Sequence, residues 1–328
     1  MAGEFSLIDQ YFKLPVVNRT VGVNQVFLGI GDDCALLDVP AGTRLAVSKD
    51  MLIEHRHFFA DVDPQSLGHK TLAVNLSDLA AMGATPLGCF LGLGLPKVND
   101  QWLSAFAKGF HALSQASNCP LLGGDTVQTP HDISLSVTVL GYVPREQPAL
   151  VRHAAKLADD IWVSGELGAA DLAYRIRADQ LPQYKFLAGQ VNAALDWPTP
   201  RLALGQALLG VAHAAIDISD GLLQDLNHIL QASHVGARLY EPLLPIAPTL
   251  LEVSADIRQN AVLSGGEAYE LCFTAPITMR AQIQNIALQI NVPLTRVGQI
   301  VDTPGISVFD QSHHLIVQKA MGFEHFSN

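Results

Sequence analysis

Seven aspartates stand where their carboxylates could hold metal ions. We expect them at strand ends and in turns, where loops meet strands. Carboxylates gathered without cations repel one another and raise one another's pKa, so a shared site implies bound metal. Mg²⁺ takes oxygen ligands, usually one or two carboxylates plus water and phosphates, so several separated aspartates predict several Mg²⁺ ions and a polyphosphate ligand. They are Asp32, Asp33, Asp50, Asp78, Asp125, Asp217 and Asp220.

Each aspartate also has an ordinary structural interpretation. A single Asp beside a turn or a helix start is as often a cap or a turn residue as a ligand. Seven in such contexts favour the metal site.

Two short motifs sharpen the prediction. Residues 123–126 read Gly-Gly-Asp-Thr after an apolar run, so glycines could let backbone N–H groups approach a phosphate while Asp125 holds a metal. Residues 217–221 read Asp-Ile-Ser-Asp-Gly, and here a strand would feed a helix whose N-terminus faces an anion. The alternative for the second motif is an ordinary N-cap.

Both common nucleotide-binding motifs are missing from the sequence. It has no G-x-x-x-x-G-K-[ST], and Gly29-x-Gly31 lacks the third glycine of a dinucleotide fingerprint. A different ATP-binding fold is therefore required.

Alternating strand and helix patterns must position these residues. In the first half we expect strands over 26–30, 44–48, 87–95 and 133–142, and a further strand ending at 123–125. A helix should follow Asp63-Pro64 and stop at Gly83, which places Asn75 and Asp78 on one face, and a second helix should cover 100–117. The second half predicts strands over 160–164, 214–218 and 269–274 and a helix over 222–232.

The pattern predicts an α/β fold of two domains. Pro144 and Pro148 flank a polar stretch, so we place the boundary near residue 148, with domains 1–148 and 149–328. The length of 328 residues allows two cores.

Charge and cysteine content narrow the setting. The 20 Lys and Arg against 31 Asp and Glu give a net charge of −11, which argues against a nucleic-acid or anionic-membrane surface. The four cysteines are scattered without C-x-x-C spacing, so disulfides and zinc are not expected. No apolar run is long enough to span a bilayer. We expect a soluble, cytoplasmic protein.

The ordered set of motifs resembles the thiamine-monophosphate kinase family. The match begins at 31–35 and 48–52 with His57-Phe58, runs through 70–84, and continues at 123–126, 217–222, 264–267 and 322–326. The resemblance implies the aminoimidazole ribonucleotide synthetase-like fold of two α/β domains. It also implies a homodimer joined through the N-terminal sheets.

The resemblance implies a role for each matching residue. Catalysis would depend on Asp50, Asp78, Asp125 and Asp220. The implied metal ligands are Asp33, Ser48, Lys49 through its backbone carbonyl, Asp50, Asp78, Asp125, Asp217 and Asp220, with Asp32 behind them. The implied ATP contacts are Gly124, Asp125, Arg152, Ser219 and Lys108, where the family often has an aromatic residue, and the implied substrate contacts are His57, Glu267 and Phe323.

The last three have alternatives: His57 could be solvated, Glu267 could cap a turn and Phe323 could anchor the C-terminus in the core.

The chain departs from the family pattern at two places. Ala268 stands where the family usually has Asp. Residues 154–159 read Ala-Ala-Lys-Leu-Ala-Asp where the family tends to have Gly-Ala-Lys-Pro-Gly-Asp, which affects the path of the loop after Arg152.

The reaction implied is Mg²⁺-dependent, in-line transfer of the γ-phosphate of ATP to thiamine monophosphate, giving thiamine diphosphate. One alternative is a non-catalytic ATP- and metal-binding sensor, motivated by Ala268 and the altered loop. Another is a different enzyme of the superfamily, such as a selenophosphate synthetase or a hydrogenase-maturation dehydratase. The position of the first cysteine, Cys34, and the ending Phe326-Ser327-Asn328 disfavour these two.

Overall fold

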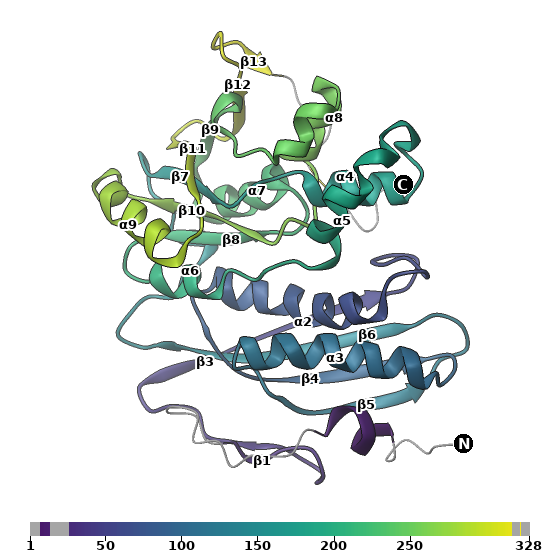
Figure 1. Ribbon diagram of the computed structural model, residues 1–328. Coiled ribbons are helices and arrows are strands. Elements are labelled where there is room, and N and C mark those ends of the chain that lie inside the picture. Colours follow the sequence, from purple (N-terminus) through teal and green to yellow (C-terminus); the bar gives the residue numbers. More distant parts are fainter. Residues whose placement is uncertain (1–6, 14–25, 317–321, 323–328) are drawn as a thin grey trace. The chain divides into compact units, whose positions relative to one another are not determined.

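The computed structural model describes residues 7–13, 26–316 and 322. The chain divides into two compact units, Met1–Leu79 with Ala84–Gln147 and Ala80–Gly83 with Pro148–Asn328. Both units mix helices and strands, as predicted (Figure 1). Two roles stay predictions: that domain 1–148 binds metal and ATP and forms the dimer, and that domain 149–328 completes the nucleotide and substrate site.

The first unit is built on a four-stranded sheet in the order β3-β6-β4-β5. The pair β4·β5 is parallel and the other two pairs are antiparallel. The strands are β3 (Thr43–Ile53), β4 (Thr85–Leu95), β5 (Leu121–Gln128) and β6 (Ser134–Pro144). The remaining elements are β1 (Val26–Leu28) paired with β2 (Leu36–Leu37), the helices α2 (Pro64–Ala81) and α3 (Asp100–Ala116), and the short η1 (Ile8–Phe12).

Helix α2 begins and ends where the sequence predicts. The Asp63 carboxylate accepts the Ser66 backbone N–H at 2.9 Å, Pro64 takes the first helical position, and Gly83 follows the helix with φ 68°. Helices α2 and α3 lie very close together, because a Cβ on Gly109 would fall 1.8 Å from the Gln65 carbonyl oxygen of α2.

One face of this sheet is covered and the other is open. Helices α2 and α3 lie over the covered face (Figure 1), where alternate residues of β6 are buried. On the other face of β3, Leu45, Val47 and Met51 are each about half exposed, at 50%, 59% and 51%.

Two predicted strand boundaries are wrong. The strand expected over 44–48 extends from Thr43 to Ile53, because it pairs with β6 along its whole length. The strand expected to end at 123–125 continues to Gln128, because β5 pairs with β4 as far as Leu95. Asp50 and Asp125 therefore lie within strands and not at their ends.

The second unit is built on a seven-stranded mixed sheet in the order β13-β12-β9-β11-β7-β10-β8. Its strands are β7 (Asp160–Ser164), β8 (Ala214–Ile218), β9 (Gly236–Tyr240), β10 (Glu270–Ala275), β11 (Leu294–Val301), β12 (Gly305–Phe309) and β13 (Leu315–Ile316). Its α-helices are α4 (Ala169–Arg177), α5 (Ala188–Asp196), α6 (Leu202–Ala207), α7 (Leu222–Ser233), α8 (Ala255–Leu263) and α9 (Arg280–Ile290). Short 3₁₀ segments are η2 (Arg152–Ala154), η3 (Pro182–Leu187), η4 (Glu241–Leu243), η5 (Pro248–Glu252) and η6 (Ile277–Met279).

This sheet is buried on both faces. Ile161 and Val163 of β7 pack with α4, α5, α7 and α8, whereas Trp162 between them packs with α6 and α9. Burial on both faces explains why β7, β8 and β10 are continuously buried instead of alternating.

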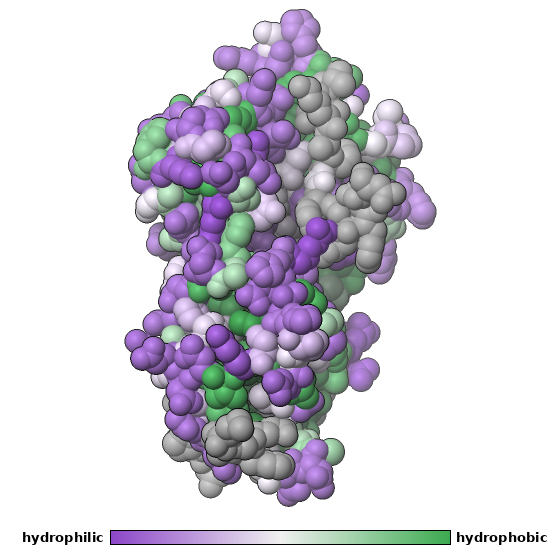
Figure 2. All heavy atoms as spheres, turned by 90° about the vertical axis from the view of Figure 1, so that its right-hand side faces the viewer, coloured by the Kyte–Doolittle hydropathy of each residue, from purple (hydrophilic) through white to green (hydrophobic). Residues whose placement is uncertain are grey.

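The surface is mixed in character. On the face drawn in Figure 2, hydrophilic side chains surround smaller hydrophobic patches. Within the described part of the chain, no helix is both long enough and apolar enough to cross a membrane.

The altered loop after Arg152 keeps a defined turn. The Asp159 N–H donates to the Lys156 carbonyl at 3.1 Å, and Ala158 in the third position has φ 67°. This is the pattern of a type II turn, which favours Pro second and Gly third. Leu157 and Ala158 therefore form a type II turn at the two positions where the family tends to have Pro and Gly.

We predict that Ala158→Gly stabilises the protein by about 1 kcal/mol, because it relieves an alanine held in the left-handed region. The reverse change at an open left-handed site, Gly42→Ala at φ 75°, should destabilise by a similar amount. Chemical denaturation of both variants measures these changes, and an Ala158→Gly variant less stable than wild type would contradict the assignment of the turn.

Candidate active site

The first unit brings Ser48, Asp50 and Asp78 together across β3 and α2. The Ser48 hydroxyl donates to the Asp78 carboxylate. The Asn75 side-chain oxygen accepts the Asp50 backbone N–H at 3.0 Å. Asn75 and Asp78 thus share the helix face that meets β3, as the sequence predicts.

The electrostatics of this group fit a cation. Burial, and to a smaller extent the charge of Asp78, raise the pKa of Asp50 from its ordinary 3.8 to about 6. A partly buried carboxylate beside a second carboxylate offers the oxygen ligands that Mg²⁺ prefers.

Lys49 and Asp125 belong to the opposite face of the same sheet. The Lys49 ammonium donates to the Ser136 hydroxyl at 2.5 Å. Ser136 pairs with Gly92, and Gly92 pairs with Asp125, so these residues point to the open face. Within this unit the sheet itself separates Asp125 from Asp50.

A glycine is needed at position 124 for a structural reason that involves no ligand. A Cβ at this position would fall 1.9 Å from the Leu91 carbonyl oxygen of β4. The glycine is therefore required by the neighbouring strand, whatever else it contacts.

Three other predicted residues of this unit lie elsewhere. Asp33 is exposed, and its backbone N–H donates to the Asp32 carboxylate at 2.9 Å, so Asp32 supports the local turn. His57 uses Nδ1 to accept the Ile53 N–H at 3.0 Å, which fixes the turn after β3.

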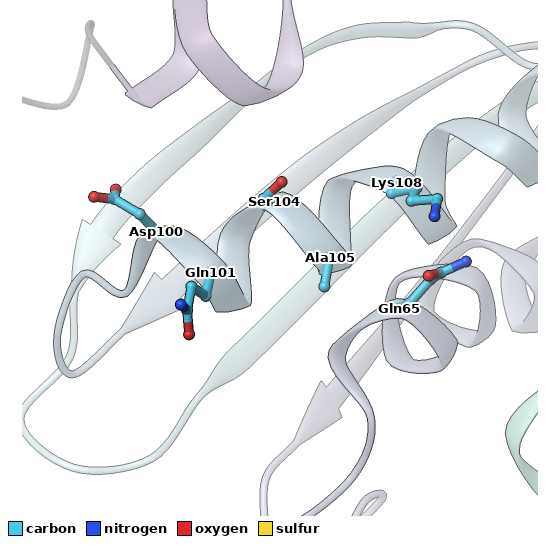
Figure 3. Close-up of a pocket in the computed structure, with 6 residues that line it drawn as sticks. All are labelled: Gln65, Asp100, Gln101, Ser104, Ala105 and Lys108. Carbon is cyan, nitrogen blue, oxygen red and sulfur yellow. The ribbon is translucent and has the colours of Figure 1, made fainter.

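Lys108 lines a shallow groove between α2 and α3 (Figure 3). The other lining residues are Gln65, Asp100, Gln101, Ser104 and Ala105. Among the residues that the structure describes, no other predicted site residue lines this groove.

The second unit holds Asp217 at the end of β8 and Ser219 and Asp220 in the turn that leads to α7. Asp217 is buried in the sheet, whereas Ser219 and Asp220 are partly exposed. We expected the N–H groups at this helix start to face an external anion. They instead face Asp225, whose Oδ2 accepts N–H bonds from Ser219, Asp220 and Gly221 at 3.0, 3.0 and 3.1 Å.

Asp225 was missed in the sequence. Its only signal was an acidic residue in the first turn of a helix, which is common and has an ordinary explanation in the helix dipole. Only the structure shows that its carboxylate accepts hydrogen bonds from the N–H groups of the turn.

Glu267 lies beside the same turn. Its backbone N–H donates to the Ser219 carbonyl at 2.7 Å, and the Tyr269 N–H donates to the Ile218 carbonyl at 2.8 Å. Glu267 and Tyr269 both have positive φ, 67° and 49°, an uncommon conformation for these residue types. Ala268 between them packs against the hydrophobic core of this unit.

The remaining two predicted contacts are differently placed. Phe323 lies outside the described residues, but its neighbour Gly322 is close to the turn, because a Cβ there would be 2.7 Å from the Asp220 carbonyl oxygen. The Arg152 carbonyl accepts from Ser233, at the far end of α7, roughly 17 Å along the helix from its start. The Arg152 backbone is therefore distant from the Asp220 turn.

A separate group of possible metal ligands consists of Glu54, His55 and Asp132, whose ligand atoms lie within 4.8 Å of one another. None of the predicted aspartates belongs to such a three-residue group among the residues that the structure describes.

Two domain families match the chain in the order of its two units. The N-terminal domain of AIR synthase related protein matches residues 31–143, and the C-terminal domain of AIR synthase related protein matches residues 157–311. Fold and domain order thus define an AIR synthase related protein, which confirms the predicted fold class.

Full-length relatives specify the family within this class. A thiamine-monophosphate kinase from Salmonella typhimurium is 42% identical over 99% of this chain and 98% of the relative. The crystal structure of thiamine-monophosphate kinase from Stenotrophomonas maltophilia K279a has 45% identity and a TM-score of 0.80, covering 86% of this chain and 90% of that chain. The structure of AaThiL complexed with AMPPCP and TMP has 27% identity and a TM-score of 0.76, covering 90% and 92%. This chain belongs to the thiamine-monophosphate kinase family, as the motifs predicted.

We predict that Asp50 lowers the stability of the metal-free protein as pH rises. Its pKa is higher in the folded state, about 6, than the ordinary 3.8, so the folded state binds the proton more tightly. The free energy of unfolding should therefore fall between about pH 4 and pH 6 and level off above, by about 3 kcal/mol at most. Asp50→Asn should lack this slope and be more stable than wild type above pH 6.

Thermal unfolding in a metal chelator from pH 4 to pH 8 measures this difference. Asp38→Asn, at an exposed aspartate, is the control and should keep the wild-type slope. A wild-type slope in Asp50→Asn would contradict the assignment.

Proposed function

We propose that this protein is an ATP- and Mg²⁺-dependent thiamine-monophosphate kinase that makes thiamine diphosphate by direct phosphoryl transfer. Membership of the family over 99% of the chain is the observation that carries the activity and the substrate. The complex of the family member AaThiL with AMPPCP and TMP supports ATP and thiamine monophosphate as the two substrates.

The carboxylates of each unit are proposed to hold the metal. In the first unit Asp50 and Asp78, with the hydroxyl of Ser48, offer oxygen ligands on one face of β3 and α2. In the second unit Asp217 and Asp220 stand on either side of Ser219. Asp33, Asp125 and the Lys49 carbonyl are proposed as further ligands. Bound Mg²⁺ supplies charge neutralisation to the phosphates during transfer.

The proposed chemistry needs positioning more than a base. A phosphate oxygen of thiamine monophosphate attacks the γ-phosphorus of ATP, the bond from that phosphorus to the β–γ bridging oxygen breaks, and ADP leaves. The attacking monoester is already mostly ionised at neutral pH, because its second pKa is about 6. The proposed role of the carboxylates is therefore to hold the positive charge of Mg²⁺ beside the phosphates.

The contacts to the substrates follow from the family. We propose Gly124, Asp125, Ser219, Arg152 and Lys108 for ATP, and His57, Glu267 and Phe323 for thiamine monophosphate. Glu267 has the best structural support, because its backbone is bonded to Ser219 and held in an uncommon conformation. A cytoplasmic location stays a prediction.

The sensor alternative loses one of its two motives. The turn after Arg152 has the form of a type II turn although it lacks the Pro and Gly that such a turn favours. Ala268, the other motive, lies between Glu267 and Tyr269 and packs against the hydrophobic core of the second unit.

We predict that the purified protein, with ATP and Mg²⁺, forms ADP and thiamine diphosphate in equal amounts only when thiamine monophosphate is present. Asp78→Asn and Asp220→Asn should each reduce turnover on the order of 100-fold or more, because each removes a negative ligand from the transfer site. Coupled ADP detection and chromatography of thiamine diphosphate measure both.

Circular dichroism and thermal unfolding serve as folding controls for these variants. ATP binding by the wild type without any thiamine diphosphate would favour the sensor. Near-normal turnover in either variant would remove that residue from the catalytic group.

We also propose a homodimer formed through the open face of the N-terminal sheet. Leu45, Val47 and Met51 form an exposed apolar row on β3, and such rows commonly mark protein interfaces.

We predict that Val47→Asp converts the dimer to a monomer in sedimentation velocity, because it places a charge in the row that the dimer would bury. Leu288→Asp, at an 80% exposed leucine of α9, is the control. A dimer that persists in Val47→Asp, or a wild-type monomer, would contradict this interface.

A further inference from the structure

Asp225 makes an unusual set of contacts at the start of α7. A single carboxylate oxygen, Oδ2, accepts three successive backbone N–H groups, those of Ser219, Asp220 and Gly221. Asp225 is the fourth residue of the helix, and its side chain turns back over the helix start. The contacts therefore fix the turn that carries Ser219 and Asp220.

The turn is held from its other side as well. The Ser219 carbonyl accepts from the Glu267 N–H, and Gly221 adopts φ 127°, which a residue with a Cβ would rarely adopt. Because three N–H groups and the Ser219 carbonyl of this turn are hydrogen-bonded, its backbone has little freedom. The Cα and Cβ atoms of Asp220 are therefore held in one position.

The surroundings make these bonds costly to lose. Asp225 is 3% exposed and Gly221 is buried, so water does not readily replace the missing acceptor. Beneath Asp225 lies the fully buried Cys272 of β10, whose thiol pKa is raised by burial and by the charge of Asp225.

A carboxylate in this place occupies the groups that a phosphate would use. N–H groups at a helix start commonly bind anions, and here all three already donate to one carboxyl oxygen of the chain itself. The backbone N–H groups of this turn therefore do not bind the nucleotide, and the turn can act on a ligand through its side chains.

We propose that Asp225 is a positioning residue that takes the place of a phosphate at the start of α7 and so aims the Ser219–Asp220 turn at a metal ion. The inference rests on the proposed function in assigning Mg²⁺ to Asp220. It adds a residue that touches neither substrate nor metal and acts through the backbone.

The test compares Asp225→Ala, which removes the acceptor, with Asp225→Asn, which keeps an acceptor oxygen but removes the charge. The Mg²⁺ concentration for half-maximal activity should rise about tenfold or more in Asp225→Ala and less in Asp225→Asn, as for residues that orient metal ligands. The KM for thiamine monophosphate should change less than the Mg²⁺ requirement.

The matched control is Asp160→Asn, at a fully buried aspartate of β7 that is paired with Arg280. It should lower the thermal midpoint without changing the Mg²⁺ requirement. An equal rise of the Mg²⁺ requirement in Asp160→Asn would show a general effect of stability and overturn the proposal.

A second readout needs no activity. Inorganic sulfate should raise the thermal midpoint of Asp225→Ala more than that of wild type, because the freed N–H groups can take an external anion. Mg²⁺ should raise the midpoint of this variant less than that of wild type. If the wild type makes no product, the proposed function fails, and these two shifts still decide the role of Asp225.

Wild-type Mg²⁺ dependence in Asp225→Ala, or equal sulfate shifts in the two proteins, would overturn the proposal. If Asp225→Ala shows no cooperative unfolding, Asp225→Asn decides. An unchanged Mg²⁺ requirement in that variant would overturn the proposal equally.

Discussion

Mutual repulsion between carboxylates is the constraint on which the candidate site depends. Asp50 is removed from much of the solvent and stands within the field of Asp78, so its ionisation is opposed from two sides. The protein holds this pair in place with bonds between elements: the hydroxyl of Ser48 to Asp78, and the amide of Asn75 to the backbone of Asp50. The hydrogen bonds that join β3 to α2 therefore also hold the carboxylates of Asp50 and Asp78 close to each other.

The second unit solves a related problem with an internal anion. Asp225 is itself buried, and burial together with the charge of Asp220 raises its pKa to about 7, although the three N–H bonds lower it. Those N–H groups offset part of the desolvation cost, as an N-terminal helix dipole does for anions in general. The result is a turn whose backbone is held by hydrogen bonds from two sides.

The departures from the family pattern lose importance once their surroundings are known. Ala158 keeps the left-handed conformation of a glycine, and the closing hydrogen bond to Lys156 is retained. The methyl group of Ala268 packs into the core. Each change should alter the free energy of unfolding only slightly, because surface turns and the edge of a core usually tolerate substitution.

The sequence by itself determined the family, the α/β class and the elements with strong local signals. Asp63-Pro64 and Gly83 delimit α2 because capping and turn preferences act over a few residues. Likewise, Asn75 and Asp78 share a face because helix periodicity is local. The ends of β3 and β5 depended on the length of the partner strand, which no local pattern contains.

Only the tertiary structure decided which predicted residues meet. Strand register placed Asp125 on the open face of the sheet and Asp50 on the covered one. The packing of α7 placed the Arg152 loop at the far end of that helix, and the Asp225 side chain turned back onto the Ser219–Gly221 turn. Contacts between residues distant in sequence, and the direction of a side chain relative to a turn, follow from packing and register, and a motif carries neither.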